Sequence, residues 1–173
     1  MYGLVVLAIL GLAIVGDAQE TRLVPFEMPD QFDNLHSERE FTGTVVVFLG
    51  SGRKGSKFNE PWGKVLAGEL AGAVRDGDLQ IVGFAHLRGV PSFLSGSVRK
   101  RFPQEPEEWA LLDWKGFFAR TYGRTKGAAN LYAFDRSGRL IHRSGLREVD
   151  RKQLADVVAA LRKALATGDE IES

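Results

Sequence analysis

The apolar residues in the first half of the chain indicate strands that alternate with a helix. A continuous apolar run rich in β-branched residues, Val45–Leu49, lies within the segment Phe41–Leu49 and predicts a strand buried on both faces at the centre of a sheet. A second apolar run, Leu79–Leu87, predicts another buried strand. Between them, apolar residues recur with the 3.6-residue period of an amphipathic helix over Pro61–Arg75, which Gly77 is expected to end.

The second half of the chain continues this alternation and closes with a hairpin and a helix. After residue 88 the pattern predicts a helix, a strand, a second helix and then two strands, over Val90–Phe102, Trp109–Asp113, Lys115–Tyr122, Leu131–Phe134 and Arg139–Arg143, respectively. The segment Asp135–Gly138 predicts the hairpin turn between the last two strands. A final amphipathic helix is expected to begin at Asp150, which has capping-box spacing to Gln153, and to end at Gly168.

The order of these elements predicts one α/β domain over residues 19–168. Pro25 and Pro29 break the segment Thr21–Asn34, which is expected to form an irregular N-terminal arm with a small hairpin. Two strand–helix–strand units followed by a hairpin and a helix predict a central mixed β-sheet flanked by helices, a three-layer sandwich. Residues 169–173 are expected to form a disordered tail.

The N-terminal segment differs from the rest because it is almost wholly apolar. The run Leu4–Val15 is too short for a membrane span, which needs about 20 residues, but suits the hydrophobic region of a signal peptide. Small residues at Gly16 and Ala18 predict cleavage before Gln19. We therefore expect residues 1–18 to be the signal peptide of a periplasmic or secreted protein, with no membrane insertion after cleavage. The alternative is an uncleaved N-terminal membrane anchor.

Composition narrows the chemistry. The 173 residues include no cysteine, which excludes disulfides, thiol catalysis, zinc–thiolate sites and iron–sulfur clusters. The net charge of +1, from 23 basic and 22 acidic residues, gives no support for nucleic-acid binding. The histidines, His36, His86 and His142, are far apart and lack metal-ligand spacing with Asp or Glu. We therefore expect neither a metal nor a cofactor.

The loop after the first long strand concentrates polar groups beside the start of a helix. The segment Ser51–Ser56 holds two glycines, two basic residues and two hydroxyls, and Asn59 and Pro61 suit the first turn of a helix. Free amides and the positive end of a helix favour anions, so this loop is a candidate anion pocket. The alternative interpretation is a solvated loop whose Ser and Asn side chains cap the helix.

The element order resembles the thioredoxin-like fold in its redoxin or peroxiredoxin-like form, over roughly Val24–Leu165. Aligned on the central strand, Arg53 stands where that family has its nucleophilic thiol and Ser56 where it has its resolving thiol. The family's cis-proline position falls at Ala128 or Ala129. Thiol–disulfide exchange needs a thiolate, so the resemblance implies the fold without its redox chemistry.

A closer resemblance is to the YtfJ family of small exported bacterial proteins, which have a thioredoxin-like fold without redox cysteines. It rests on Gly52-Arg53-x-x-Ser56-x-x-Asn59-x-Pro61, on an Arg-Lys and Phe-Pro stretch before the third strand, and on the Asp-Arg-Ser-Gly-Arg hairpin. The resemblance implies export more than any activity.

These observations predict a non-catalytic binding or accessory module of the cell envelope. The expected partner is an extended peptide or protein, which thioredoxin-like proteins bind along this edge, or a small anion. The candidate ligand-binding residues are Gly52, Arg53, Lys54, Ser56, Asn59, Ala129 and Asn130.

Two alternatives belong to the enzymes. In the first, Ser56 is a hydrolytic nucleophile assisted by Arg53 and by His86, which ends the strand expected beside the central one. In the second, the chain is a degenerate peroxiredoxin-like protein. The missing thiol excludes peroxidase chemistry by cysteine, and the spacing of residues shows no Ser–His–Asp arrangement.

Overall fold

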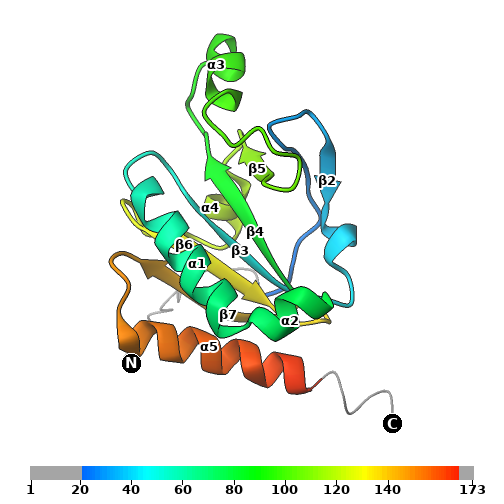
Figure 1. The fold of residues 1–173 in the computed structure, drawn as a ribbon. Helices are drawn as coiled ribbons and strands as arrows, with labels where there is room; N and C mark the ends of the chain where they lie inside the picture. The colour runs from blue at the N-terminus through cyan, green and yellow to red at the C-terminus, as the bar shows by residue number, and fades with distance from the viewer. Residues whose placement is uncertain (1–20, 168–173) are drawn as a thin grey trace, which may run out of the picture.

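The computed structural model describes residues 21–167, and the signal peptide expected at 1–18 and the tail at 169–173 lie outside them. A five-stranded sheet in the order β5-β4-β3-β6-β7 forms the centre (Figure 1). Its strands are β3 (Val45–Ser51), β4 (Leu79–His86), β5 (Ala110–Asp113), β6 (Ala129–Phe134) and β7 (Leu140–Leu146). Strands β3, β4 and β5 are parallel, whereas β6 is antiparallel to both β3 and β7, so the sheet is mixed as predicted.

Strand β3 is the central strand because its side chains fill hydrophobic cores on both faces of the sheet. Val47 and Leu49 belong to one core cluster, while Val46 and Phe48 belong to the other. Every residue of β3 is buried. The unbroken apolar run therefore predicted this strand correctly. When both faces of a strand are buried, apolar residues are favoured at every position and do not alternate with polar ones.

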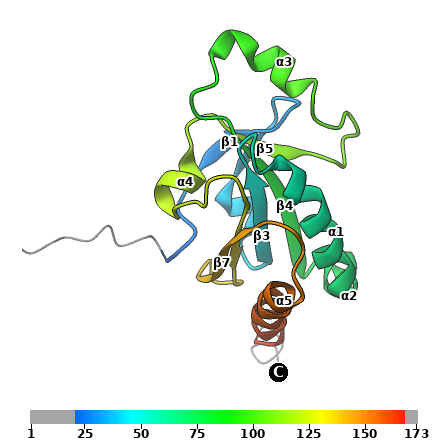
Figure 2. The same cartoon turned by 90° about the vertical axis from the view of Figure 1, so that its left-hand side faces the viewer.

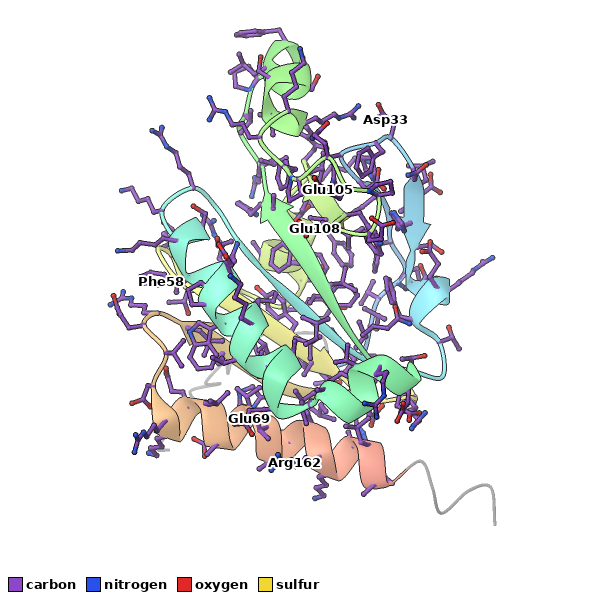
Figure 3. All side chains as sticks on the ribbon, in the orientation of Figure 1. Asp33, Phe58, Glu69, Glu105, Glu108 and Arg162 are labelled. Atoms are coloured by element: carbon purple, nitrogen blue, oxygen red, sulfur yellow. The ribbon has the colours of Figure 1, made fainter. Side chains whose placement is uncertain are left out.

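Three helices cover the first core. They are α1 (Asn59–Glu69), α2 (Ala71–Asp76) and α5 (Arg151–Ala166), and α1 and α5 are joined at their surface by an ion pair between Glu69 and Arg162 (3.4 Å, Figure 3). The single helix expected at 61–75 is instead broken at Leu70, whose φ of −123° and ψ of 27° are not helical. Gly77 ends the second piece with a φ of 83°, as predicted.

The N-terminus of α5 is capped as predicted, because the Asp150 carboxylate accepts a hydrogen bond from the Gln153 amide at 2.9 Å.

The N-terminal arm and α4 (Phe117–Thr121) cover the second core, and α4 lies on the side of the sheet opposite the α1–α2 pair (Figure 2). The arm forms the expected hairpin from β1 (Glu27–Pro29) and β2 (Leu35–Ser37), followed by the 3₁₀ turn η1 (Glu38–Phe41). Aromatic rings dominate this core: Phe26, Phe41, Phe48, Phe84, Phe118, Tyr122, Tyr132 and Phe134.

The prediction of one helix over Val90–Phe102 was wrong. The segment contains only η3 (Ser92–Leu94) and α3 (Ser95–Arg99), which project beyond the end of the sheet (Figure 1). Phe93 is 82% exposed and Leu94 is also exposed, so these apolar side chains do not pack into a core. Pro91, whose ψ of 138° is extended, lies outside the first turn and is not part of a helix. The spacing of apolar residues predicted a longer helix because it does not show whether a core faces the segment.

Within residues 21–167, none of the helices is both long and apolar enough to cross a membrane.

Candidate functional site

Four loops meet at one end of the sheet, next to a fifth loop, 147–150, that follows β7. The parallel strands β3, β4 and β5 all end there, and the antiparallel strand β6 begins there. The loops are 52–58 after β3, 87–91 after β4, 114–116 after β5 and 122–128 before β6. The carboxyl ends of parallel strands are where open α/β sheets bind ligands, because the loops there are free to carry chemistry.

The loop after β3 is held by its own backbone and runs directly into α1. The Gly55 amide donates to the Gly52 carbonyl at 2.9 Å, and the Phe58 amide donates to the Gly55 carbonyl at 3.0 Å. The resulting 3₁₀ turn η2 (Ser56–Phe58) continues into α1, and Figure 3 labels Phe58 at this junction. The side chains of Arg53, Lys54 and Ser56 are exposed on this loop, beside the start of the helix.

The loop after β3 lies against the loop before β6. A Cβ atom on Gly55 would lie 2.6 Å from the carbonyl carbon of Ala128 and closer still to its oxygen, so only glycine fits without a backbone shift. The resemblance had aligned these two loops as the motif and the cis-proline position of a redox site. They do meet in space, although among the described residues no peptide bond is cis.

The candidate residues Ala129 and Asn130 face inward at this point. Ala129 is fully buried and Asn130 is 5% exposed. The Asn130 Oδ1 accepts from the Thr125 amide (2.6 Å), while its Nδ2 donates to the carbonyls of Thr125 (3.2 Å) and Ala128 (3.1 Å). Asn130 therefore uses its side chain to fix the loop before β6, and it supports the edge more than it presents a surface to a ligand.

Asn59, another candidate residue, lies at the start of α1 and is partly buried. Its Oδ1 atom is buried and, among the described residues, has no hydrogen-bond partner. Its side chain does not cap the helix, because the N-cap position is taken by Phe58. The same holds for Ser51 at the end of β3, whose buried Oγ also has no partner in the part of the chain described. Unpaired buried polar atoms are costly and uncommon, and two of them flank this loop.

His86 ends β4 and sits between two glycines. A Cβ atom on Gly52 would lie 3.8 Å from its Cδ2, and one on Gly116 would lie 2.9 Å from its Cε1. Its buried Nδ1 lies 3.9 Å from Asp113 Oδ2, too far for a hydrogen bond. Burial, and then the positive charges of Arg124 and Arg88, hold the pKa of His86 below its usual value, while Asp113 acts in the opposite direction.

Asp113, which lies opposite His86 on the neighbouring strand, has a structural role. Its side chain is 1% exposed. Its two oxygens accept from the amides of Phe117 (2.6 Å) and Phe118 (3.2 Å), which are the first residues of α4. The sequence indicates that Asp113 ends a strand and bonds nearby backbone, and the structure confirms this, because Asp113 accepts from the free amides at the start of the following helix.

Arg124 is a residue of the candidate site that sequence reasoning missed. Its Nη1 would lie 3.5 Å from a Cβ atom on Gly52, so the guanidinium extends from the loop before β6 to the loop after β3. Within the described residues it makes no hydrogen bond and no ion pair. About 70 residues separate Arg124 from Arg53, and no local motif links them, so only the fold brings them to one edge.

The four loops are uniformly basic. They carry Arg53, Lys54, Lys57, Arg88, Lys115, Arg124 and Lys126, and none of them contains an Asp or Glu. The adjacent carboxylate, Asp113, is buried. The balanced net charge of +1 therefore conceals a concentration of positive charge on these four loops, next to the loop 147–150 after β7, which carries Glu148 and Asp150.

The hydrolytic arrangement is not assembled by this geometry. The Ser56 hydroxyl donates to the Arg53 carbonyl at 3.0 Å and is exposed. His86 Nδ1 lies 3.9 Å from Asp113 Oδ2, and the charges of Arg124 and Arg88 also act on the ring. In residues 21–167 no hydrogen bond joins Ser56 to His86, and no cluster of three or more His, Cys, Asp or Glu side chains could hold a metal ion.

Comparison with known proteins identifies the fold. No family model matches the sequence, and no curated protein matches it. Among solved structures, a putative protein disulfide isomerase from Bacteroides thetaiotaomicron matches with a TM-score of 0.61 and 14% identity, covering 88% of this chain and 92% of that one. The fold is thioredoxin-like.

Two further structures extend this likeness. A putative thiol:disulfide interchange protein DsbE from Chlorobium tepidum has a TM-score of 0.58 and 21% identity, over 83% of this chain and 97% of that one. The exposed lipoprotein thioredoxin Etrx1 of Streptococcus pneumoniae strain TIGR4 has a TM-score of 0.54 and 13% identity, over 79% and 98%. The likeness shows the fold alone, and a chain with no cysteine offers no thiol for the exchange reaction.

Proposed function

We propose that this protein is an exported, non-catalytic accessory module of the cell envelope, of the YtfJ kind, that holds an anionic group at its basic edge. The observation that carries the proposal is Arg124, whose guanidinium reaches Gly52 at the centre of four basic loops and has no ion-pair partner among the described residues. A guanidinium without a counterion beside other cations favours an incoming anion.

Of the two ligands expected from the sequence, the contacts favour a small anion over an extended peptide. A peptide strand needs free backbone groups with which to pair. The Ala128 carbonyl at this edge already accepts a hydrogen bond from Asn130 and lies against Gly55. The charged side chains of Arg53, Lys54 and Arg124, in contrast, are exposed.

Export is supported by the apolar leader at 1–18 and by the kinds of protein that share the fold. The similar structures include the exposed lipoprotein Etrx1 and a SCO1/SenC family lipoprotein from Bacillus anthracis. Expression of the full chain in a Gram-negative host tests this part. We expect the periplasmic fraction to hold a chain that begins at Gln19, and recovery of only the uncleaved chain in the membrane fraction would favour the anchored alternative.

The binding proposal is tested by thermal denaturation with citrate as a multivalent anion and with an acidic peptide. Ligand at about 100 times its dissociation constant adds about 2.7 kcal/mol to the free energy of unfolding, which raises the Tm by several degrees. Arg124→Gln and Arg53→Ala should reduce the shift. Arg75→Gln is the matched control, because Arg75 is an exposed residue of α2, away from this edge. No shift with either ligand, or an equal shift in all variants, would refute the proposal.

A further inference from the structure

A polar cavity of about 350 Å³ lies beside the basic edge. It is lined by the loop Gly123–Thr125, by Asn130 of β6 and by the segment Arg143–Gly145 of β7. We infer that this cavity binds the phosphoryl group of a small phosphomonoester, with Arg124 and Arg143 as its two cationic ligands. The inference deepens the proposed function and rests on it, because it names the chemical class of the anion and the second arginine.

The walls of the cavity are fixed before any ligand arrives. A Cβ atom on Gly145 would lie 2.9 Å from Thr125 Cγ2 and closer to its Cβ and Oγ1, so the bare glycine lets the loop rest on β7. Asn130 binds both the amide and the carbonyl of Thr125. Arg124 therefore projects from a loop that is anchored on two strands, and a fixed site loses less entropy on binding.

The two arginines retain unused hydrogen-bond donors. Arg143 donates from Nη1 to the Tyr122 carbonyl at 2.5 Å, and the other N–H groups of its guanidinium remain available to a ligand. Arg124 makes no hydrogen bond or ion pair within residues 21–167. No carboxylate lines the cavity. Thr125 and Ser144 are among its lining residues, and the Ser144 hydroxyl lies 3.3 Å from His142 Nε2.

The donor set fits a phosphoryl group better than a carboxylate. A guanidinium binds two oxygens of an anion with two parallel hydrogen bonds, so one carboxylate satisfies a single arginine. A phosphomonoester carries up to two negative charges and three terminal oxygens, enough to engage both arginines and a hydroxyl. A volume of about 350 Å³ is in the range of small-molecule pockets and leaves room for the organic part of the ester.

The experiment is isothermal titration calorimetry at low ionic strength with three probes: inorganic phosphate, phenyl phosphate and acetate. We expect both phosphoryl probes to bind more tightly than acetate. Arg124→Gln and Arg143→Gln should each weaken phenyl phosphate binding at least tenfold. Arg139→Gln is the matched control, because Arg139 is an exposed arginine that precedes β7 and does not line this cavity, and its affinity should stay within twofold of wild type.

Arg143→Lys keeps the positive charge but removes the pair of parallel hydrogen bonds that a guanidinium can form. It should therefore also weaken phosphoryl binding. Circular dichroism melts of each variant establish that it folds. Unchanged phenyl phosphate affinity in a folded Arg143→Gln variant would overturn the inference. If citrate binding still depends on Arg124 in that case, the proposed function stands without it; if no anion binds at all, both fall.

Discussion

Gly55 and Ala128 are in direct backbone contact at the end of the sheet where the candidate site lies. The carbonyl carbon of Ala128 lies only 2.6 Å from the position that a Gly55 Cβ would occupy. This contact joins the loop after β3 to the loop before β6, through two residues that are 73 positions apart in the chain. The backbones from which the basic side chains of both loops extend are therefore held against one another.

Gly55→Ala is expected to destabilise the protein by about 1–3 kcal/mol, because the added methyl group displaces the Ala128 backbone. Gly63→Ala is the control. Its methyl group would lie 3.8 Å from Leu49 Cδ2, an ordinary contact, and alanine is favoured within α1. Urea unfolding measures both free energies. Equal stability of the two variants would show that the loops are not locked together.

Asn130→Ala is expected to lower the free energy of unfolding by about 2–4 kcal/mol, because it removes three hydrogen bonds at a buried position. Lys126→Ala, at an exposed position of the loop that Asn130 holds in place, should change it by less than about 0.5 kcal/mol. Faster hydrogen exchange at the Thr125 amide should accompany the first change alone. A stable Asn130→Ala variant that merely lost ligand binding would instead make Asn130 a contact residue.

Stability should fall as the pH drops below about 6.5, the ordinary histidine value. Burial lowers the pKa of both His86 and His142 in the folded chain, so the unfolded chain binds protons first as acid is added. Their stabilising contribution is complete above the unfolded pKa and is lost as the pH falls towards the folded pKa. Urea unfolding between pH 7.5 and 5 measures this slope. Replacing both histidines by asparagine should flatten it, and an unchanged slope would assign it to other groups.

Arg124→Gln should raise the pKa of His86, because the guanidinium charge is one of the causes that lower it. A proton NMR titration of the His86 ring measures the change directly. His142, whose pKa is lowered by burial and not by Arg124, is the internal control and should not move. A His86 pKa that stays constant would place the Arg124 charge too far away to act at this edge.

The core elements were predictable because the pattern of apolar residues along each of them matches the side chains that are buried. The apolar run of β3, the stripe of α5 and the Asp135–Gly138 turn all specify their structure locally, and all were predicted. Two elements were not. The break at Leu70 and the exposure of Phe93 depend on what faces those segments in space, and spacing along the chain does not report that.

The site was predictable only in part. The loop after β3 was identified because glycines, hydroxyls and bases are contiguous there. Arg124, Arg88 and Arg143 come from separate segments, so the positive edge exists only in the folded chain. The net charge of +1 did not reveal the basic loops for the same reason, because it does not say where the charges lie in the folded chain.

The most direct test of the basic edge is a map of backbone amide shifts in ¹H–¹⁵N NMR spectra during titration with phosphate. We expect saturable shifts concentrated in loops 52–58, 87–91, 114–116 and 122–128 and in Arg143–Gly145, and their loss in Arg124→Gln. Shifts that instead concentrate at the exposed basic segment Arg99–Arg101, or that are spread over the surface without saturating, would contradict it.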